Sequence, residues 1–276
     1  MESGGLLILG AGGLLGSELA ALRKEALRPS HEELDLTERG AALAYLKARR
    51  PAAVINCAAA AGVDRCEHEP EWAYLLNARA AAELAAACRA CGAHLVHIST
   101  DYVFDGRART PLKEDAPARP LNLYGRSKRL GEQAVLRQGG CVLRLQWLYG
   151  AGRRGFVDWV EACAGRGEVR AVCDCFGAPT WAREGARMAL ALSAARAAGV
   201  VHGACEGMTS WMGFAREVLR QTGWQAELRP ALARELGRPA VRPAYTVFCL
   251  DRLRRFYAPR PWQAALRDFL RERESR

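Results

Sequence analysis

Tyr124 and Lys128 are four residues apart, a spacing that places both side chains on one face of a helix. A phenol beside an ammonium group suits carbonyl reduction, because hydride addition to a ketone leaves an alkoxide that needs a proton. A cation about 4 Å away, at an effective dielectric near 20, supplies the roughly 4 kcal/mol needed to lower a tyrosine pKa from ~10 to ~7. We therefore expect Lys128 to lower the pKa of Tyr124. The pair also occurs by chance in many helices, so its meaning depends on neighbouring residues.

Thr100 is the first such neighbour, in the run Ser99-Thr100-Asp101-Tyr102 that follows a strand-like segment at 94–98. Open α/β sheets bind ligands at the carboxyl ends of their strands, which is where this run falls. The Thr100 hydroxyl is able to donate a hydrogen bond to the same carbonyl oxygen and share its developing charge. The alternative is a threonine turn that only caps the strand.

A glycine loop, GAGGLLG at 10–16, directly follows a predicted strand and opens a predicted helix. In this context Gly10 permits a tight turn, Gly13 allows the backbone to approach a pyrophosphate, and Gly16 allows close packing of helix on sheet. The GxxGxxG spacing is typical of short-chain dehydrogenases. The alternative is a glycine-rich turn that binds no ligand.

The segment LRPS at 27–30 bears on the choice of cofactor. A carboxylate near the end of the second strand normally holds the adenosine ribose and favours NAD, but no acid occurs here before Glu32. Arg28 and Ser30 are suited to a 2′-phosphate, which favours NADPH, with NADH possible. Two alternatives stay open: Arg28 points into solvent, or Asp35 reaches the adenosine instead.

The order of elements predicts an α/β fold, because apolar runs of strand length alternate with longer amphipathic segments. Strands are expected at 6–10, 53–57, 94–99 and 141–147, and helices at 14–24, 37–49, 71–91 and 124–137. This pattern predicts a Rossmann-like, doubly wound parallel sheet over residues 1–150. A smaller substrate lobe is expected over 151–276, where Gly, Arg and Pro clusters interrupt the pattern. A strand-helix-strand set at 169–202 is compatible with a return to the first sheet, which would make the lobe partly discontinuous. The final segment, 262–273, is expected to be an amphipathic helix.

Composition limits the class of protein. The net charge is +10, but the 40 basic residues are spread along the chain, so no nucleic-acid partner is expected. The ten cysteines are expected to be reduced thiols, and Cys88-x-x-Cys91 lacks a second pair with zinc-binding spacing. The start of the chain is too poor in positive charge for a signal peptide, and no apolar run is long enough to span a membrane. We expect a cytoplasmic protein with no membrane partner.

Several motifs together resemble the extended short-chain dehydrogenases and, within them, the dTDP-4-dehydrorhamnose reductase family. Besides the glycine loop they are ELDLT at 33–37, VINCAA at 54–59 with VD at 63–64, STDYVFDG at 99–106, PLNLYGRSK at 120–128, DCFGAPT at 174–180 and RP at 242–243. The resemblance spans nearly the whole chain, and the STDYVF run is its most specific part.

The resemblance implies a catalytic triad of Thr100, Tyr124 and Lys128. Tyr124 would protonate the C4 oxygen of the sugar, and Lys128 would also hold the nicotinamide ribose. The residues expected at the cofactor are Gly10, Gly13, Leu14, Leu15, Gly16, Arg28, Ser30, Asp35, Leu36, Ala58, Ala59, Ala60, Tyr124 and Lys128, and those at the nucleotide-sugar substrate are Thr100, Asp101, Tyr102 and Trp147. The implied reaction is reduction of dTDP-4-dehydro-L-rhamnose by NADPH or NADH, the final step of dTDP-rhamnose biosynthesis for surface carbohydrates.

The sequence departs from the family pattern at three positions. Some members dimerise around magnesium held by glutamates; Glu18 matches one ligand, but Arg183 replaces another, so no metal is expected and the chain is a monomer or a homodimer. Cys175 replaces a common glutamine and Gln146 a common small hydroxyl residue, and both are expected to alter the sugar pocket. Two other functions remain alternatives: a regulatory subunit like the beta subunit of methionine adenosyltransferase, and a nucleotide-sugar epimerase or dehydratase. An acidic pair typical of the dehydratases is missing after Thr100, which disfavours dehydration.

Overall fold

The computed structural model describes residues 5–152 and 154–275. Most of the chain start on which the expectation of no signal peptide rests lies outside these residues. The strands are β1 Leu6–Leu9, β2 Ala53–Asn56, β3 His94–Thr100, β4 Cys141–Leu145, β5 Leu148–Tyr149, β6 Glu168–Val172, β7 Phe176–Gly177, β8 Thr180–Trp181, β9 Gly199–Gly203, β10 Thr209–Ser210 and β11 Glu227–Ala231. The helices are α1 Leu14–Leu22, α2 Ala41–Arg49, α3 Val63–His68, α4 Pro70–Tyr74, α5 Ala81–Cys91, α6 Leu123–Arg137, α7 Phe156–Ala164, α8 Ala182–Ala194, α9 Trp211–Thr222 and α10 Trp262–Glu274, with a π-helix η1 at Leu75–Ala80 and 3-10 turns η2 Asp101–Val103, η3 Ala233–Leu236 and η4 Leu253–Arg255.

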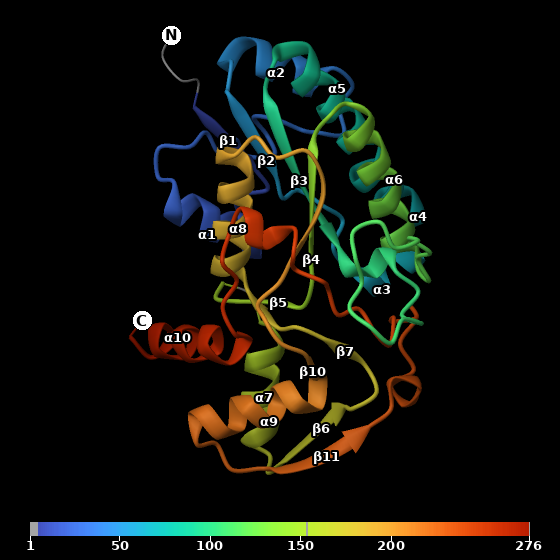
Figure 1. The fold of residues 1–276 in the computed structure, drawn as a ribbon, viewed down its shortest axis with the longest axis vertical. Coiled ribbons are helices and arrows are strands. Elements are labelled where there is room, and N and C mark those ends of the chain that lie inside the picture. Colours follow the sequence, from blue (N-terminus) through green and yellow to red (C-terminus); the bar gives the residue numbers. More distant parts are fainter. Residues whose placement is uncertain (1–4, 153, 276) are drawn as a thin grey trace.

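A five-stranded parallel sheet forms the centre of the molecule, in the order β1-β2-β3-β4-β9. Its strands are almost continuously apolar because both faces are covered, and every residue of β4 is buried. Helices α1 and α8 pack on one face, and α2, α5 and α6 pack on the other (Figure 1). The predicted doubly wound α/β fold is thus confirmed.

The second lobe lies below the carboxyl ends of the central strands (Figure 1). It contains the parallel pair β6–β11 and helices α7, α9 and α10, which enclose a core of their own. Aromatic side chains such as Phe214 and Phe269 dominate that core. Strand β9 belongs to the central sheet, whereas β6 pairs with β11 outside it, so the chain passes between the two parts more than once.

Several expected elements differ from the prediction, such as the first helix, which ends at Leu22 instead of residue 24. The helix expected at 37–49 begins at Ala41, because the Asp35 carboxylate accepts hydrogen bonds from the backbone N–H and the hydroxyl of Thr37 in a turn. The strand expected at 141–147 ends at Leu145, because Trp147 has a left-handed backbone (φ 47°). The helix expected at 71–91 is present in three consecutive parts, α4, η1 and α5.

All ten cysteines are free thiols, so the expectation of reduced cysteines is met. Within residues 5–152 and 154–275, no helix has both the length and the apolar character required to cross a membrane.

Candidate active site

The glycine loop lies where the chain leaves β1, at the carboxyl edge of the sheet between β1 and β2. Gly10 has φ +73°, and a Cβ there would lie 2.7 Å from the backbone nitrogen of Ala58. A Cβ on Gly16 would lie 2.1 Å from the Gly10 carbonyl oxygen. These two positions therefore require glycine because other backbone segments approach them closely. Leu27 forms a parallel bridge with Leu7 on the side of β1 that faces away from β2. The chain therefore leaves β1 toward one side of the sheet and later returns to the other side to form β2. Such a reversal is a topological switch point, where open α/β sheets bind nucleotides.

The start of α1 is suited to an anionic group. Its N-cap, Gly13, provides no side-chain cap, and the first turn contains no acidic residue. A Cβ on Gly12 would meet no protein atom within 4 Å, so the loop backbone is open on that side. Uncapped N–H groups and the helix dipole favour a phosphate here. The described residues thus fit the diphosphate of a dinucleotide, with Leu14 beside the loop and Leu15 buried in the core.

The predicted adenosine segment, Ala58 to Ala60, is held by two buried asparagines. Asn56 Oδ1 accepts from the Ala58 N–H at 3.0 Å. Asn77, in the π-helix, accepts from the Ala60 N–H at 2.9 Å and donates to the Ala60 carbonyl at 3.1 Å. The backbone of this segment is therefore fixed before any ligand binds.

Arg28 and Ser30 are exposed just after the Leu27 bridge, at the edge of the sheet where a 2′-phosphate was expected. Ser30 forms reciprocal hydrogen bonds with Glu33. The Asp35 carboxylate is engaged by Thr37, and those hydrogen bonds lower its pKa. Leu36 is buried in the core, so only its backbone is available to a cofactor.

Tyr124 lies in the first turn of α6, directly against the end of β3. Asn122 caps the helix by accepting from the Gly125 N–H at 2.8 Å. A Cβ on Gly125 would lie 2.1 Å from the Tyr102 carbonyl oxygen, so glycine lets α6 approach the Asp101–Val103 turn. The structure thereby brings Thr100 and Tyr124 together, close enough for the Thr100 hydroxyl to influence the pKa of Tyr124.

The pKa of Tyr124 differs from the expectation. Burial raises it above its ordinary value, the Thr100 hydroxyl lowers it in part, and the Asp101 carboxylate raises it further. Lys128 is not among the main causes of this shift. The expected lowering by Lys128 is therefore absent from this state of the protein, because the Lys128 side chain is directed elsewhere.

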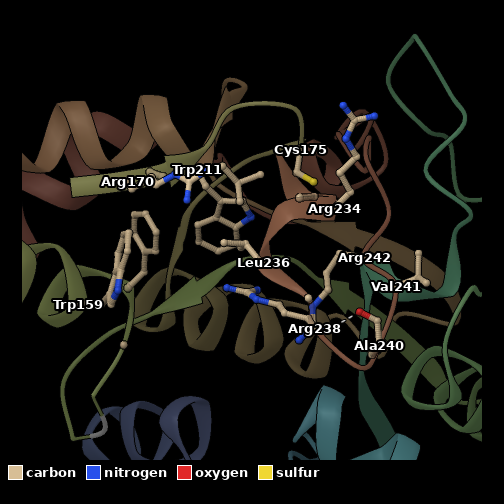
Figure 2. Close-up of a pocket in the computed structure, with 16 residues that line it drawn as sticks. Trp159, Arg170, Cys175, Trp211, Arg234, Leu236, Arg238, Ala240, Val241 and Arg242 are labelled. Atoms are coloured by element: carbon tan, nitrogen blue, oxygen red, sulfur yellow. Dashed lines mark hydrogen bonds between the residues drawn. The ribbon is translucent and has the colours of Figure 1, made fainter. Parts of the chain in front are cut away.

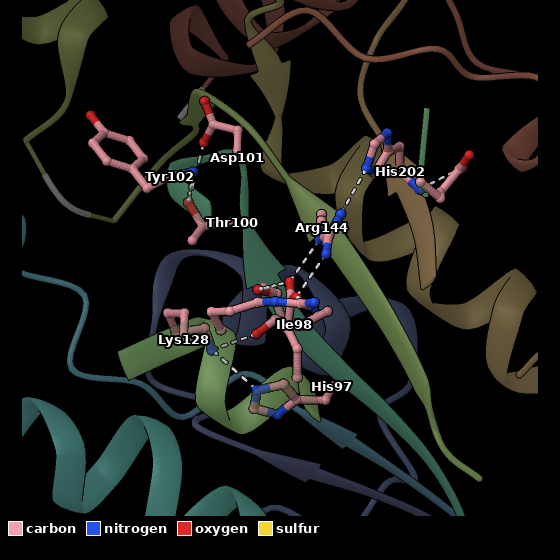
Figure 3. Close-up of polar contacts among 12 residues, drawn as sticks. His97, Ile98, Thr100, Asp101, Tyr102, Lys128, Arg144 and His202 are labelled. Atoms are coloured by element: carbon pink, nitrogen blue, oxygen red, sulfur yellow. Dashed lines mark hydrogen bonds and ion pairs between the residues drawn. The ribbon is translucent and has the colours of Figure 1, made fainter. Parts of the chain in front are cut away.

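Lys128 is almost fully buried and points at β3 (Figure 3). Its Nζ donates to the Ile98 carbonyl at 2.6 Å and lies 3.3 Å from His97 Nε2. Burial lowers the pKa of Lys128 to about 8, although Glu132 and Cys57 act in the opposite direction.

A buried ion pair stabilises α6 against the sheet behind Lys128. Arg144, on β4, donates to both carboxylate oxygens of Glu132 at 2.7 and 2.8 Å. Glu132 also accepts from the Ser99 hydroxyl at 2.7 Å, and the hydrogen bonds of Arg144 keep the Glu132 pKa low despite its burial. Because its groups are hydrogen-bonded to one another, this network fixes the turn of α6 that follows Lys128, the candidate catalytic lysine.

Asp101 is buried, and its carboxylate accepts from Thr100 at 3.2 Å (Figure 3). The carboxylate also accepts from the Thr246 hydroxyl at 2.7 Å. Burial raises the pKa of Asp101 to about 6. Tyr102 packs edge-on against Tyr124, with ring centroids 5.7 Å apart. Asp101 thus connects the end of β3 to the chain segment that returns from the second lobe.

Arg242 forms a second link between the two parts of the molecule. It donates to Asp64 Oδ2 at 2.8 Å, and this bonding lowers the pKa of the Asp64 carboxyl to about 2. Arg242 also forms a hydrogen bond with the Tyr102 side chain. The RP motif at 242–243 is therefore placed beside the candidate substrate residues.

Trp147 stacks on Trp211 of α9, with ring centroids 3.9 Å apart and planes 10° apart. Gln146 accepts from the Ala178 N–H at 3.1 Å, while its buried Nε2 has no hydrogen-bond partner among the described residues. Gln146 thus occupies space beside Trp147 that a smaller hydroxyl residue would leave open.

A cavity of about 660 Å³ opens in the second lobe (Figure 2). Its walls include Phe156, Trp159, Arg170, Cys175, Trp211, Arg234, Arg238 and Arg242. Arg170 is paired with Glu235, and Arg242, which also lines the cavity, is bonded to Asp64 of α3. Its size is within the range of small-molecule sites, and its arginines and aromatic rings suit an anionic ligand that also carries a flat ring.

Arg183, the residue in place of a magnesium ligand, forms ion pairs within the chain. It donates to Glu18 at 2.8 Å and to Glu272 Oε1 at 2.8 Å. No group of three or more potential metal ligands occurs in the described parts of the chain.

Several site residues were not identified from the sequence: Asn56, Asn77, His97, Glu132 and Arg144. Three of them carried a signal, because Asn56, His97 and Arg144 interrupt apolar strands that are buried on both faces, where a polar side chain requires a partner.

The parallel sheet, the glycine loop at its switch point and the Thr100, Tyr124 and Lys128 set define a protein of the extended short-chain dehydrogenase/reductase class. The family model for the RmlD substrate binding domain matches residues 4–275. The chain belongs to this family, and several of its relatives are named dTDP-4-dehydrorhamnose reductases.

Individual relatives agree with this assignment. A dTDP-4-dehydrorhamnose reductase of Streptomyces griseus is 41% identical over 94% of this chain and 91% of its own length. A probable dTDP-4,6-dihydroxy-2-methyloxan-3-one 4-ketoreductase of Streptomyces antibioticus is 42% identical over 95% of this chain and 93% of its own. The structure of a Bacillus anthracis dTDP-4-dehydrorhamnose reductase in complex with NADP superposes with a TM-score of 0.92 and 32% identity, covering 97% of this chain and 98% of that one.

Proposed function

We propose that this chain is an NADPH-dependent oxidoreductase that reduces the C4 keto group of a dTDP-linked deoxysugar, with dTDP-4-dehydro-L-rhamnose as substrate and dTDP-L-rhamnose as product. The observation that carries the proposal is the adjacent pair of Thr100 and Tyr124 at the carboxyl end of β3, with Lys128 one turn further along α6. Two relatives that are 41% and 42% identical to this chain are named for different 4-ketosugars. The identity of the sugar is therefore a more specific proposal than the reduction of a C4 keto group.

Each catalytic side chain has one role in this proposal. The bound nicotinamide cofactor supplies the hydride. Tyr124 donates its phenolic proton to the C4 oxygen, and its raised pKa keeps that proton in place until charge develops on the oxygen. Thr100 donates a second hydrogen bond to the same oxygen. Lys128 holds the nicotinamide ribose, for which its side chain has to leave Ile98 and His97.

The cofactor and the substrate occupy different parts of the molecule. We assign the diphosphate of NADPH to the start of α1, its adenosine to Ala58–Ala60 and its 2′-phosphate to Arg28 and Ser30, with NADH as a weaker substitute. We assign the sugar to Thr100, Asp101, Tyr102 and Trp147, and the nucleotide to the arginine-lined cavity. Residues 1–150 together with 182–203 then form the cofactor domain, and most of the remaining chain forms the substrate lobe. We further propose that the enzyme acts in the cytoplasm as a monomer or homodimer without a metal ion.

A substrate panel tests the proposal. Purified protein is incubated with dTDP-4-dehydrorhamnose or another dTDP-4-ketosugar, each with NADPH and with NADH, and cofactor oxidation is followed by absorbance. We expect stoichiometric oxidation, fastest with dTDP-4-dehydrorhamnose and NADPH. No oxidation with any of these sugars would refute the reductase function.

The same assay separates the alternative functions. A nucleotide-sugar epimerase would convert substrate while its tightly bound NAD is returned unchanged, so product would form without net oxidation of cofactor. A regulatory subunit would bind cofactor, show no turnover and copurify with a synthetase.

A further inference from the structure

A chain of buried polar groups extends behind Lys128, from β3 to β2. His97 lies between Lys128 and Asn56, with Nε2 3.3 Å from Lys128 Nζ and Nδ1 3.1 Å from Asn56 Nδ2. Asn56 Oδ1 in turn accepts from the backbone N–H of Ala58 at 3.0 Å. Asn56, His97 and Lys128 are each at most 3% exposed, so water does not supply alternative partners.

The Ala58 N–H determines the direction of every hydrogen bond in this series of buried groups. A backbone N–H only donates, so the Asn56 oxygen must face it, and the Asn56 NH2 group must then face His97. His97 Nδ1 is therefore the acceptor. Burial is the largest cause that holds the pKa of His97 well below its ordinary value, so the ring is neutral. A neutral imidazole with an unprotonated Nδ1 carries its proton on Nε2.

This tautomer directs an N–H group at Lys128. An ammonium group has three donors and no lone pair, so charged Lys128 meets His97 Nε2–H as donor against donor. A neutral amine accepts from Nε2–H and still donates to the Ile98 carbonyl at 2.6 Å. The geometry therefore favours the neutral amine over the ammonium form.

The other groups around Lys128 do not reverse this preference. Glu132, on α6, and Cys57, after β2, favour the charged form, but Glu132 is already bonded to Arg144 and Ser99. Burial opposes them and is the larger effect, which leaves the pKa of Lys128 at about 8.

We propose that Asn56 and His97 are positioning residues that weaken proton binding at Lys128 in the cofactor-free protein, so that binding of NADP⁺ or NADPH is coupled to proton uptake at Lys128. The proposal rests on the proposed function, in which Lys128 binds the nicotinamide ribose. Ribose hydroxyls offer acceptor oxygens in place of the His97 N–H, and the ammonium form is then favoured. The proton comes from hydronium or from the acid form of the buffer, whose bond to that hydrogen breaks as the third N–H bond of Lys128 forms.

Nitrogen NMR of the cofactor-free wild-type protein tests the tautomer without any ligand. The chain has five histidines, and comparison with His97→Gln identifies the signals of His97. We expect an unprotonated Nδ1 and a protonated Nε2. A protonated Nδ1 would overturn the proposal, whether or not the protein is a reductase.

Calorimetric titration with NADP⁺ at pH 8, in two buffers of different ionisation enthalpy, tests the coupling. At this pH the free protein holds about half a proton on Lys128, so binding is expected to take up about half a proton. The ligand's 2′-phosphate is already ionised at pH 8, because phosphate groups of this kind titrate near pH ~6. Binding without proton uptake would overturn the coupling alone, whereas no binding of NADP⁺ would overturn the proposed function as well.

Asn56→Asp is the decisive variant, because both carboxylate oxygens accept. One oxygen retains the Ala58 N–H, the other accepts from His97 Nδ1–H, and Nε2 becomes an acceptor for the Lys128 ammonium. We expect NMR to show the ring tautomer reversed and the proton uptake at pH 8 to fall to less than about half of the wild-type value. An unchanged tautomer or unchanged uptake would overturn the proposal.

His94→Gln is the matched control, since His94 lies on the same strand but outside this chain of hydrogen bonds. Its proton uptake is expected to equal that of the wild type, and a loss as large as in Asn56→Asp would overturn the assignment to His97. If Asn56→Asp does not fold, Asn56→Ser replaces it. Serine is too short to bridge Ala58 and His97, so the ring is released and uptake is expected to fall; unchanged uptake in this variant would also overturn the proposal.

Discussion

The cofactor side and the substrate side of this protein position their groups differently. On the cofactor side, a parallel sheet and the backbone of the glycine loop define the site, and buried side chains such as Glu132 and Arg144 are fully bonded. On the substrate side, the cavity is built from side chains of loops and two-stranded ladders, including Arg238 and Trp211. The contrast suggests that the backbone of the cofactor site is fixed before binding, whereas the choice of sugar depends on a few replaceable side chains.

Replacing the proton donor should disable the chemistry while leaving both binding regions intact. We expect Tyr124→Phe to lower kcat by about 10²- to 10⁴-fold, because general acid catalysis by a positioned group typically contributes that much. NADPH affinity, measured by fluorescence titration, should stay within about twofold. Tyr149→Phe is the control, since the buried Tyr149 hydroxyl has no hydrogen-bond partner among the described residues and lies in the core of the second lobe. Equal kcat in Tyr124→Phe and the wild type would remove Tyr124 from the mechanism.

Breaking one ion pair in the cofactor region and one in the second lobe compares the contributions of the two pairs to the free energy of unfolding. Glu132→Gln leaves Arg144 buried without its counter-charge, and we expect the free energy of unfolding to fall by about 3 to 5 kcal/mol. Glu217→Gln removes the partner of the exposed Arg220 in the second lobe, and should cost no more than about 1 kcal/mol. Both values are obtained from urea unfolding. Similar losses in the two variants would contradict the proposed difference between the regions.

Asp101, at the junction of the two regions, gives a pH-dependent effect. Its folded pKa of about 6 is above the ordinary 3.8, so the folded protein binds this proton more tightly. Stability therefore falls as pH rises from about 4 to about 6, and above that the charged carboxylate costs up to about 3 kcal/mol. Asp101→Asn should raise Tm relative to wild type at pH 7.5, and this gain should shrink at pH 4.5. A gain that grows on acidification would show that burial does not raise the Asp101 pKa.

The smallest effects should separate the two sites. Arg28→Gln is expected to raise KM for NADPH by about 3- to 10-fold, with KM for the sugar nucleotide unchanged. Arg238→Gln should do the reverse, because Arg238 lines the substrate cavity. Steady-state kinetics with each substrate varied in turn gives both constants. If each variant raised both KM values equally, the two arginines would not serve separate sites.

The cofactor side was also the more predictable from sequence, for a physical reason. The glycine loop and the Tyr124–Lys128 spacing are local patterns, and a local pattern determines both its own backbone and its position at the end of a strand. The Asn56–His97 contact joins residues 41 apart, and the Arg242–Asp64 pair joins residues 178 apart. No local spacing specifies such contacts. The direction of the Lys128 side chain was unpredictable for the same reason, because it depends on His97 and Ile98 from another element.

Trp147 has a consequence for engineering and evolution. A left-handed backbone costs a residue with a Cβ about 1 to 2 kcal/mol, and tryptophan gains no local hydrogen bond that would offset this. Selection for heat resistance alone should therefore favour glycine or asparagine at this position. Such variants would lose the stack on Trp211 and, with it, the aromatic wall of the proposed sugar site. Libraries screened only for stability should thus accumulate folded proteins that discriminate poorly among sugars.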